Sequence, residues 1–192
     1  MNKLVKQGLV GLGVAIIAVN LVACSLFTPS GDLVQRVSDG DTLVLKTVDG
    51  AKITVRFACV DAPEVPHSQK EKNSKITQDM NQFAWGIQAQ TRIEKLIKEA
   101  DNRVKLNITD SDRYGRKVAE VRLANGTFLQ QILLQEGLAK VYRPYLNKCP
   151  SRNILQQIEA QAKQQKLGIW GDRKFVDPWD YRKGRKQVNV DG

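Results

Sequence analysis

Val55-Arg56-Phe57-Ala58-Cys59-Val60-Asp61-Ala62-Pro63-Glu64 is the stretch around which we expect the chain to fold. Its first half has the β-branched and apolar residues of a strand, and Pro63 cannot continue a central strand. A buried, unpaired charge is costly, so Arg56 indicates an acidic partner nearby. The stretch therefore predicts a strand that ends on two carboxylates, Asp61 and Glu64, beside a guanidinium group.

Two other segments carry side chains that suit the same site. Asp39-Gly40-Asp41-Thr42 lies upstream and Asp112-Arg113-Tyr114-Gly115-Arg116 lies downstream. Asp41 and Asp61 fall at the ends of different expected strands, and Ca²⁺ or Mg²⁺ prefers such hard oxygen ligands. Two carboxylates leave positions for water and a substrate phosphate, so an open site is expected. Taken alone, Asp39 and Asp41 also fit a hairpin turn with no further role.

The residue types in these segments suit phosphodiester cleavage. Glu64 could orient or deprotonate a water molecule, and Arg56 and Arg116 could bind phosphate through paired N–H donors. A donor that strengthens in the transition state is typically worth about 3 kcal/mol. Either arginine alone equally fits a surface ion pair, and both could pair with Glu64 structurally. With His67 the only histidine and no cysteines at ligand spacing, neither a zinc site nor a histidine-based mechanism is expected.

The composition indicates one basic domain. The chain has 192 residues and a net charge of +10, which is enough for one ordinary core and short for two. The first 23 residues contribute two lysines and no acid, so the remainder keeps a charge of +8. This excess favours polyanions such as nucleic acid or an anionic membrane surface, although a solvated basic surface would look the same.

Residues 1–23 have the pattern of an export signal. Lys3 and Lys6 precede an apolar run, and Leu21-Val22-Ala23-Cys24 resembles a bacterial lipobox, in which the cysteine is acylated. We expect lipidation at Cys24, a tether over 24–31, and an exported lipoprotein anchored in a cell-envelope membrane. The alternatives are an ordinary signal that is cleaved nearby and a retained transmembrane helix.

Cys59 and Cys149 remain once Cys24 is assigned to the anchor. Two cysteines in an exported domain favour a disulfide. Closing a loop of this length could contribute about 4 kcal/mol in the chain-entropy model. The alternative is one buried and one exposed thiol.

The pattern of apolar residues predicts a single domain over 32–172. Alternation favours strands at 33–37, 42–48, 52–60, 104–108 and 117–123, with a hairpin turn at Asp49-Gly50. Helical spacing favours 83–100, 127–137 with Thr127 as N-cap and Gly137 as stop, and 151–167. Residues 65–81 are expected to form a mobile loop and 173–192 an irregular tail. This order predicts an α+β protein with a five-stranded OB-fold β-barrel and three α-helices. The surface of an OB-fold commonly binds oligonucleotides.

Several segments together resemble staphylococcal (micrococcal) nuclease-like thermonucleases. They occur in the family's order and cover about residues 33–171. The segments are VSDGDT at 37–42, RFACVDAPE at 56–64, DRYGR at 112–116, GLAKV at 137–141, EAQAK at 159–163 and LGIW at 167–170.

The resemblance implies a calcium-dependent endonuclease that cuts DNA and RNA to leave 3′-phosphates. Carried over by position, Ca²⁺ would be bound by the side chains of Asp41 and Asp61 and by the Ala62 carbonyl. Arg56, Glu64 and Arg116 would be catalytic, and Arg113, Tyr114 and Tyr145 would line the nucleotide pocket. A monomer that prefers single strands is expected.

Three departures from the family pattern affect the site. Ala62 stands in place of threonine, which keeps the backbone carbonyl, and Arg143 stands in place of a pocket tyrosine. The loop after Glu64 is longer. A non-catalytic OB-fold lipoprotein that binds single-stranded nucleic acid is the alternative function, and a structural surface lipoprotein is a third. Only the enzyme requires the metal ligands and the catalytic residues together.

Overall fold

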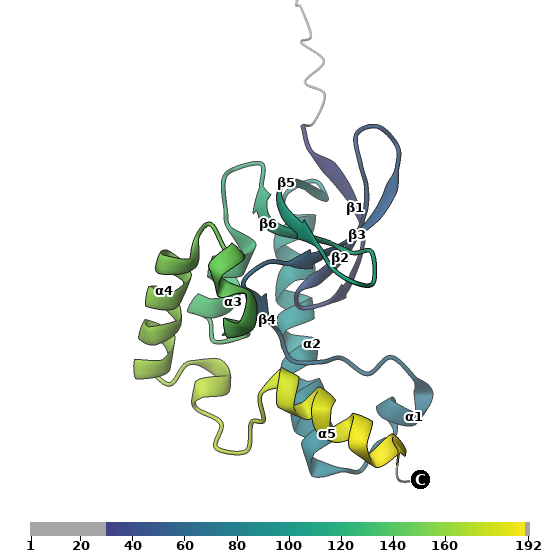
Figure 1. The fold of residues 1–192 in the computed structure, drawn as a ribbon, viewed down its shortest axis with the longest axis vertical. Coiled ribbons are helices and arrows are strands. Elements are labelled where there is room, and N and C mark those ends of the chain that lie inside the picture. The colour runs from purple at the N-terminus through teal and green to yellow at the C-terminus, as the bar shows by residue number, and fades with distance from the viewer. Residues whose placement is uncertain (1–29, 191–192) are drawn as a thin grey trace, which may run out of the picture.

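The barrel forms one end of the molecule. The computed structural model describes the backbone of residues 30–190 and the side chains of residues 30–185. Five strands close in the order β1-β2-β3-β6-β5 (Figure 1). They are β1 (Asp32–Asp39), β2 (Thr42–Lys46), β3 (Lys52–Phe57), β5 (Arg103–Ser111) and β6 (Lys117–Leu123). This closed barrel beside helices confirms the expected α+β, OB-fold class.

Strand pairing places the central stretch in the middle of the barrel wall. β1, β2 and β3 are successively antiparallel, and Thr42 pairs with Arg56. β3 also pairs with β6 in parallel, where Arg56 lies beside Val118. Because β6 is antiparallel to β5, and β5 to β1, the barrel closes and Arg56 has strands on both sides.

The strand expected over 52–60 is interrupted. β3 ends at Phe57, and Cys59 adopts a φ of +73°, which does not continue a flat strand ladder. The chain then enters β4 (Val60–Asp61), which pairs with β7 (Lys140–Val141) in a separate two-stranded sheet. A disulfide joins Cys59 to Cys149, with the Cα atoms 5.6 Å apart. The break redirects Asp61 away from the barrel ladder.

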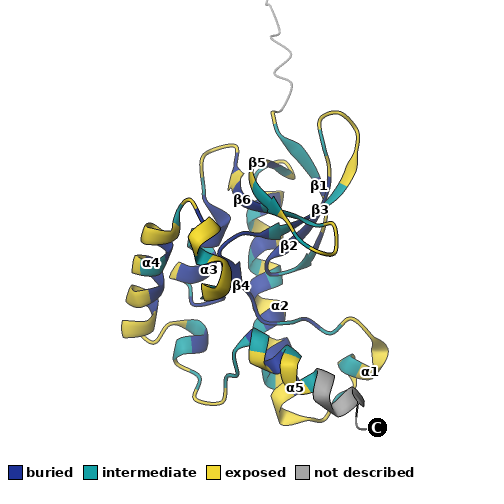
Figure 2. Ribbon diagram, in the orientation of Figure 1, coloured by how far each residue is buried: buried dark blue, intermediate teal, exposed yellow. Residues whose placement is uncertain are grey.

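Helices cover the barrel and form a second layer. α2 (Thr77–Lys98) packs on β1 through one buried face that includes Phe83, Ala89, Ile93 and Ile97. Figure 2 shows this face in the blue of buried residues. α3 (Leu129–Gln135) packs against α4 (Arg152–Gln164), and the 3₁₀ turns η1 (Arg143–Lys148) and η2 (Gly168–Trp170) flank α4 in sequence.

Two regions expected to be irregular are helical. In the stretch 65–81, α1 (Gln69–Lys72) is started by a capping box between Ser68 and Glu71, and α2 begins at Thr77. The tail forms α5 (Pro178–Val190), with proline at the first helical position. Figure 1 shows α5 crossing beside the lower part of α2, near α1.

The ends of α3 differ in how well the sequence predicts them. Thr127 is not the N-cap, because α3 follows Phe128 and has no side-chain cap. Gly137 does end the helix, with a φ of +65°, and an added Cβ would lie 2.2 Å from the carbonyl oxygen of Leu167. Only glycine therefore fits this contact.

The expected anchor is not part of the described structure. Residues 1–29, which include the signal segment and Cys24, lie outside the described residues. Among the helices that are described, none is both long and apolar enough to cross a membrane.

Candidate active site

A cavity of about 830 Å³ opens where β3 ends. Its lining includes most of the site residues expected from the sequence: Arg56, Glu64, Arg113, Tyr114, Arg116 and Tyr145. Asp41 and Asp61 lie behind this lining with no exposed surface. The fold thus gathers residues from β2, β3, β4, the β5–β6 hairpin and η1 around one space.

The first group of residues at or behind the cavity lining is a carboxylate cluster, defined as Asp41, Arg56, Asp61 and Glu64. Arg56 bridges the two buried aspartates, with Nη1 bound to Asp41 Oδ1 and Nη2 to Asp61 Oδ1. The Ala62 backbone N–H donates to Asp41 Oδ2 at 2.6 Å. Like charges that are held together in this way need cationic partners, because isolated buried carboxylates are too costly.

Burial and charge act against each other in the cluster. Burial raises the pKa of Asp41 well above its usual value, and the neighbouring Arg56 opposes that rise. Burial would lower the pKa of Arg56, but Asp41 and Asp61 outweigh it, so its pKa is raised. Arg56 therefore stays charged and neutralises the cluster.

Close helix packing fixes the two loops that carry these carboxylates. At Gly40, an added Cβ would lie 2.6 Å from the Ala89 side chain of α2. At Gly86 of α2, an added Cβ would lie 2.0 Å from the backbone oxygen of Glu64. α2 thus presses on the segments before Asp41 and at Glu64, and only glycines allow this approach.

The second group of residues at the cavity lining is an Arg-Tyr rim, defined as Arg113, Tyr114, Arg116 and Tyr145. Arg116 Nε donates to Asp112 Oδ2 at 2.7 Å. Arg113 Nη2 donates to the Tyr114 hydroxyl at 2.6 Å. Tyr114 and Tyr145 are 68% and 60% exposed, so their rings are free to meet a ligand.

The turn of the β5–β6 hairpin holds Arg116 through local contacts. Asp112 Oδ1 accepts the backbone N–H groups of Tyr114 and Arg116 at 2.9 and 3.0 Å. Although partial burial opposes it, the Arg116 side chain and these N–H groups lower the pKa of Asp112. The turn is thus built by residues within five positions of one another.

Comparisons with known proteins agree with this geometry. The sequence profile described as "Staphylococcal nuclease homologue" matches residues 54–172. A micrococcal nuclease of Shigella flexneri is 31% identical over 163 residues, which cover 81% of this chain and 82% of that protein. An uncharacterized endonuclease of Escherichia coli O157:H7 is 32% identical over 150 residues, 78% of this chain and 82% of its own length.

This chain belongs to the staphylococcal nuclease family. A more distant relative, the staphylococcal-like nuclease CAN1 of Arabidopsis thaliana, is 27% identical over 138 residues, 72% of this chain and 36% of that protein. The family and the relatives identify a nuclease, a hydrolase that acts on nucleic acid.

The donor set of this staphylococcal nuclease homologue fits a calcium ion. Asp41 and Asp61 offer carboxylate oxygens, the ligand type that calcium prefers, and in this structure Arg56, Arg182 and the Ala62 N–H contact those oxygens. In the described part of the chain, the one compact group of three ligand-type side chains is Cys59, Glu120 and Cys149. Its two sulfurs are bonded to each other, so that group retains only one carboxylate.

Arg182 is a site residue that the sequence analysis missed. Its Nη2 donates to Asp61 Oδ2 at 2.5 Å, and its Nη1 donates to Asp61 Oδ1 at 3.1 Å and Glu64 Oε1 at 2.5 Å. Although burial opposes it, these carboxylates raise the pKa of Arg182. Pro178 followed by an amphipathic run was the available signal for a helix here. No local pattern links position 182 to Glu64.

Arg143, which replaces a pocket tyrosine of the family, does not line the cavity. Its guanidinium pairs with the buried carboxylate of Glu159. Instead, Tyr142 lines the cavity and lies 5.8 Å from Tyr145, measured between ring centroids. Trp179 of α5 lies 5.9 Å from Tyr142 on the same measure. Three aromatic rings therefore continue from the Arg-Tyr rim toward α5.

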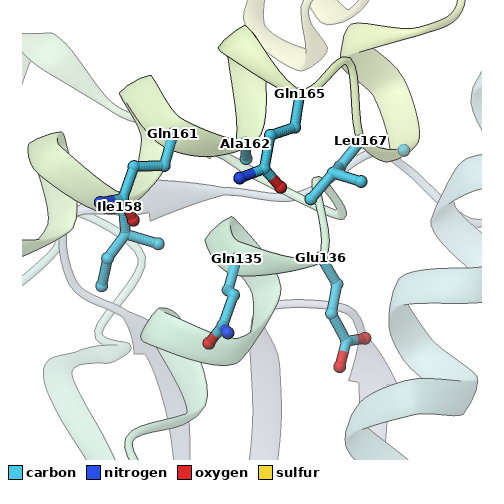
Figure 3. Close-up of a pocket in the computed structure, with 8 residues that line it drawn as sticks. Gln135, Glu136, Ile158, Gln161, Ala162, Gln165 and Leu167 are labelled. Carbon is cyan, nitrogen blue, oxygen red and sulfur yellow. The ribbon is translucent and has the colours of Figure 1, made fainter.

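A second cavity, of about 450 Å³, lies between α3 and α4 (Figure 3). Gln135 of α3 and Gln161 and Gln165 of α4 line it. Its carboxylate, Glu136, accepts hydrogen bonds from Arg92 at 2.7 to 2.9 Å. It therefore lacks the paired carboxylates and cations found at the first cavity.

Proposed function

We propose that this nuclease is a calcium-dependent, sugar-nonspecific endonuclease that hydrolyses DNA and RNA to leave 3′-phosphates. The observation that carries the proposal is that Arg56, Glu64 and Arg116 line one cavity and that Arg56 bridges the buried carboxylates of Asp41 and Asp61. A module that only bound nucleic acid would need the basic and aromatic side chains, but not two buried carboxylates bridged by an arginine.

Calcium would be held by Asp41, Asp61 and the Ala62 carbonyl, and would supply charge neutralisation and a position for water beside the phosphate. The pair of buried carboxylates supports this ligand set. In the same proposal, Arg56 stands between the aspartates and the cavity, and each of its terminal nitrogens carries a second N–H in addition to the one that an aspartate accepts.

Glu64 takes the role of orienting the attacking water and accepting its proton. The water oxygen forms a bond to phosphorus, and the bond from phosphorus to the 5′ oxygen breaks. The products are a 3′-phosphate and a 5′-hydroxyl whose oxygen gains a proton. Arg56 and Arg116 both line the cavity and could stabilise the charge that grows on the phosphoryl oxygens.

Single strands are the preferred substrate in this proposal. Tyr114 and Tyr145 are exposed at the rim, and stacking on an aromatic ring is worth about 1–3 kcal/mol per base. Stacking requires bases that are not paired inside a duplex. Arg113, whose guanidinium lies 4.8 Å from the centre of the Tyr114 ring, adds a cation beside that stacking surface.

We also propose that the protein is exported and anchored at the cell envelope as a monomeric lipoprotein. The lipobox-like segment that ends at Cys24 supports the anchor. The disulfide between Cys59 and Cys149 supports an oxidising compartment. Labelled fatty acid should enter the wild type but not Cys24→Ala, and equal labelling of both would contradict the anchor.

Digestion of plasmid DNA and of RNA tests the enzymatic proposal. The wild type should cut both with calcium, neither with a chelator, and Arg116→Ala should cut poorly with calcium. End labelling of the products should give 3′-phosphates. Binding of single strands without calcium-dependent cleavage would instead favour the non-catalytic OB-fold module, and no affinity for nucleic acid would favour a structural lipoprotein.

A further inference from the structure

Arg182 reaches the carboxylate cluster from a segment outside the family match. The match ends at residue 172, whereas α5 spans Pro178–Val190. The Arg182 guanidinium nevertheless contacts both oxygens of Asp61 and one of Glu64, at 2.5 to 3.1 Å. Arg182 also lines the cavity beside Arg56. This chain therefore adds a third arginine to the site.

The docking of α5 fixes the position from which Arg182 extends. Tyr181, the preceding residue, is 2% exposed and donates its hydroxyl to Asp79 Oδ1 of α2 at 2.8 Å. Its ring meets Phe83 of α2 edge to face, with centroids 6.1 Å apart. Residues before and after Tyr181 form ion pairs: Asp177 with Lys140 at 2.5 Å, and Arg185 with Glu71 at 2.6 Å.

Arg182 hydrogen-bonds the carboxylate of Glu64. Among the side chains described, Arg182 alone hydrogen-bonds the Glu64 carboxylate, and it does so at Oε1. Oε2 accepts no hydrogen bond from residues 30–185, and it remains available to a water molecule. A glutamate without such a partner samples several rotamers, and fixing them costs up to about 2 kcal/mol.

We propose that Arg182 is a positioning residue of the active site, which holds the Glu64 carboxylate beside Asp61 with Oε2 turned to the cavity. Arg182 acts through Glu64 and need not touch the substrate. The inference rests on the proposed function, in which Glu64 prepares the attacking water. Partners of this kind commonly change activity by about 10- to 100-fold when they are removed.

The same contacts fit an opposite role, in which Arg182 blocks the carboxylates. A guanidinium near Asp61 repels a divalent cation, and removal of the arginine would then speed the reaction at limiting calcium. The free Oε2 of Glu64 is what positioning requires, whereas the contacts to both oxygens of Asp61 are what blocking would require. The two roles predict turnover changes of opposite sign.

The test compares Arg182→Ala and Arg182→Lys with Lys183→Ala, using a fluorescently labelled single-stranded DNA oligonucleotide and calcium over a range of concentrations. Lys183→Ala is the matched control, since it removes an exposed cation next to Arg182 on the same helix that makes no hydrogen bond or ion pair with the described residues. Arg182→Ala should lower kcat about 10- to 100-fold with little change in KM. Arg182→Lys should recover part of the loss, and the control should keep wild-type turnover.

A double-mutant cycle separates this role from loss of structure. If Arg182 acts through Glu64, Arg182→Ala should change kcat by no more than about twofold in a Glu64→Gln background. A drop of the same size in both backgrounds would overturn the proposal, as would a rise in turnover. Melting curves of Arg182→Lys, which keeps the charge and the aliphatic stem, would identify an effect that comes only from undocking of α5.

The failure of this inference is distinguishable from the failure of the proposed function. A Glu64→Gln variant that cuts as fast as the wild type would remove the role of Glu64 in the function itself. An inactive Glu64→Gln beside a fully active Arg182→Ala would leave that function standing and overturn only the role of Arg182.

Discussion

The carboxylate cluster and the Arg-Tyr rim face the same cavity but are held in place differently. Arg56 is fixed by aspartates from two other elements, 15 and 5 residues away, whereas Arg116 is fixed by Asp112 within one turn. The side chains of Asp41 and Asp61 are at most 1% exposed, while Tyr114 and Tyr145 are mostly exposed. The comparison suggests a preorganised centre for chemistry and an adaptable rim for the polymer.

The largest effect is expected at Glu64, the one cluster residue with a carboxylate oxygen that accepts no hydrogen bond from the described residues. Glu64→Gln removes a proton acceptor but keeps the shape, so kcat should fall about 100- to 10,000-fold while the fold persists. Single-turnover cleavage and a thermal melt measure the two quantities. Near-normal turnover would mean that another group activates the water.

Replacing each arginine by alanine tests the comparison directly. Arg56→Ala leaves the buried Asp41 without its cationic partner, while Asp61 keeps Arg182. Breaking such a buried pair should lower the free energy of unfolding by about 3–5 kcal/mol. Arg116→Ala, at the rim, should change stability by only about 0.5 kcal/mol and still reduce kcat about 100- to 1,000-fold. Urea unfolding and turnover should be measured on both variants. Equal losses of stability in the two would contradict the comparison.

The disulfide joins the cluster side to the rim side, since Cys59 precedes β4 and Cys149 follows η1. Replacing both cysteines by serine should lower the free energy of unfolding by about 2–5 kcal/mol, because the cross-link restricts the unfolded chain across 90 residues. Urea unfolding of the double variant, with wild type under reducing conditions as a second reference, measures the loss. A change below 1 kcal/mol would argue that packing alone holds the two sides together.

Rim tyrosines should affect binding rather than stability. Tyr145→Ala should weaken binding of a single-stranded oligonucleotide by about 1–3 kcal/mol, while Tyr145→Phe should keep most of the affinity if stacking dominates. Fluorescence anisotropy with the Glu64→Gln protein measures binding without cleavage. A large loss in Tyr145→Phe would instead point to a hydrogen bond from the hydroxyl to phosphate.

The smallest effect concerns the segment that leads to α5. Asp172 accepts hydrogen bonds from Trp85 Nε1 at 2.8 Å and Asn81 Nδ2 at 2.6 Å, and these lower its pKa. A lowered pKa adds stability above the unfolded-state value and loses it as pH falls through the folded-state value. Asp172→Ala should therefore cost about 1 kcal/mol at pH 7 and less in acid. Melting curves that keep the same offset at pH 7 and in acid would contradict this assignment.

The sequence predicted the barrel well because each strand has a local pattern of alternating apolar residues or a turn signal. Alternating apolar residues and the Asp49-Gly50 turn marked the β2–β3 hairpin. The family motifs named Asp41, Arg56 and Asp61, and the structure joins these three side chains through Arg56. The lining of the cavity includes Glu64, Arg116 and the rim residues that the resemblance suggested. Their chemical roles remain predictions.

What the sequence did not predict depends on contacts between distant residues. Tyr181 hydrogen-bonds Asp79, which lies 102 positions away in the sequence, and Arg182 hydrogen-bonds Glu64, which lies 118 positions away. A weakly periodic tail gives no sign of such partners, so it was expected to be irregular. The break in the strand at Cys59 is similar, because the left-handed backbone there accompanies a bond to Cys149.

The late position of Arg182 has a consequence for the order of synthesis. A ribosome adds Asp61 and Glu64 to the chain long before it adds Arg182, since 118 positions separate Glu64 from Arg182. If Arg182 orients Glu64 as proposed, a growing polypeptide that already contains Asp61 and Glu64 would still lack the residue that completes its active site. Full catalytic activity would then require translation to pass the codon for Arg182.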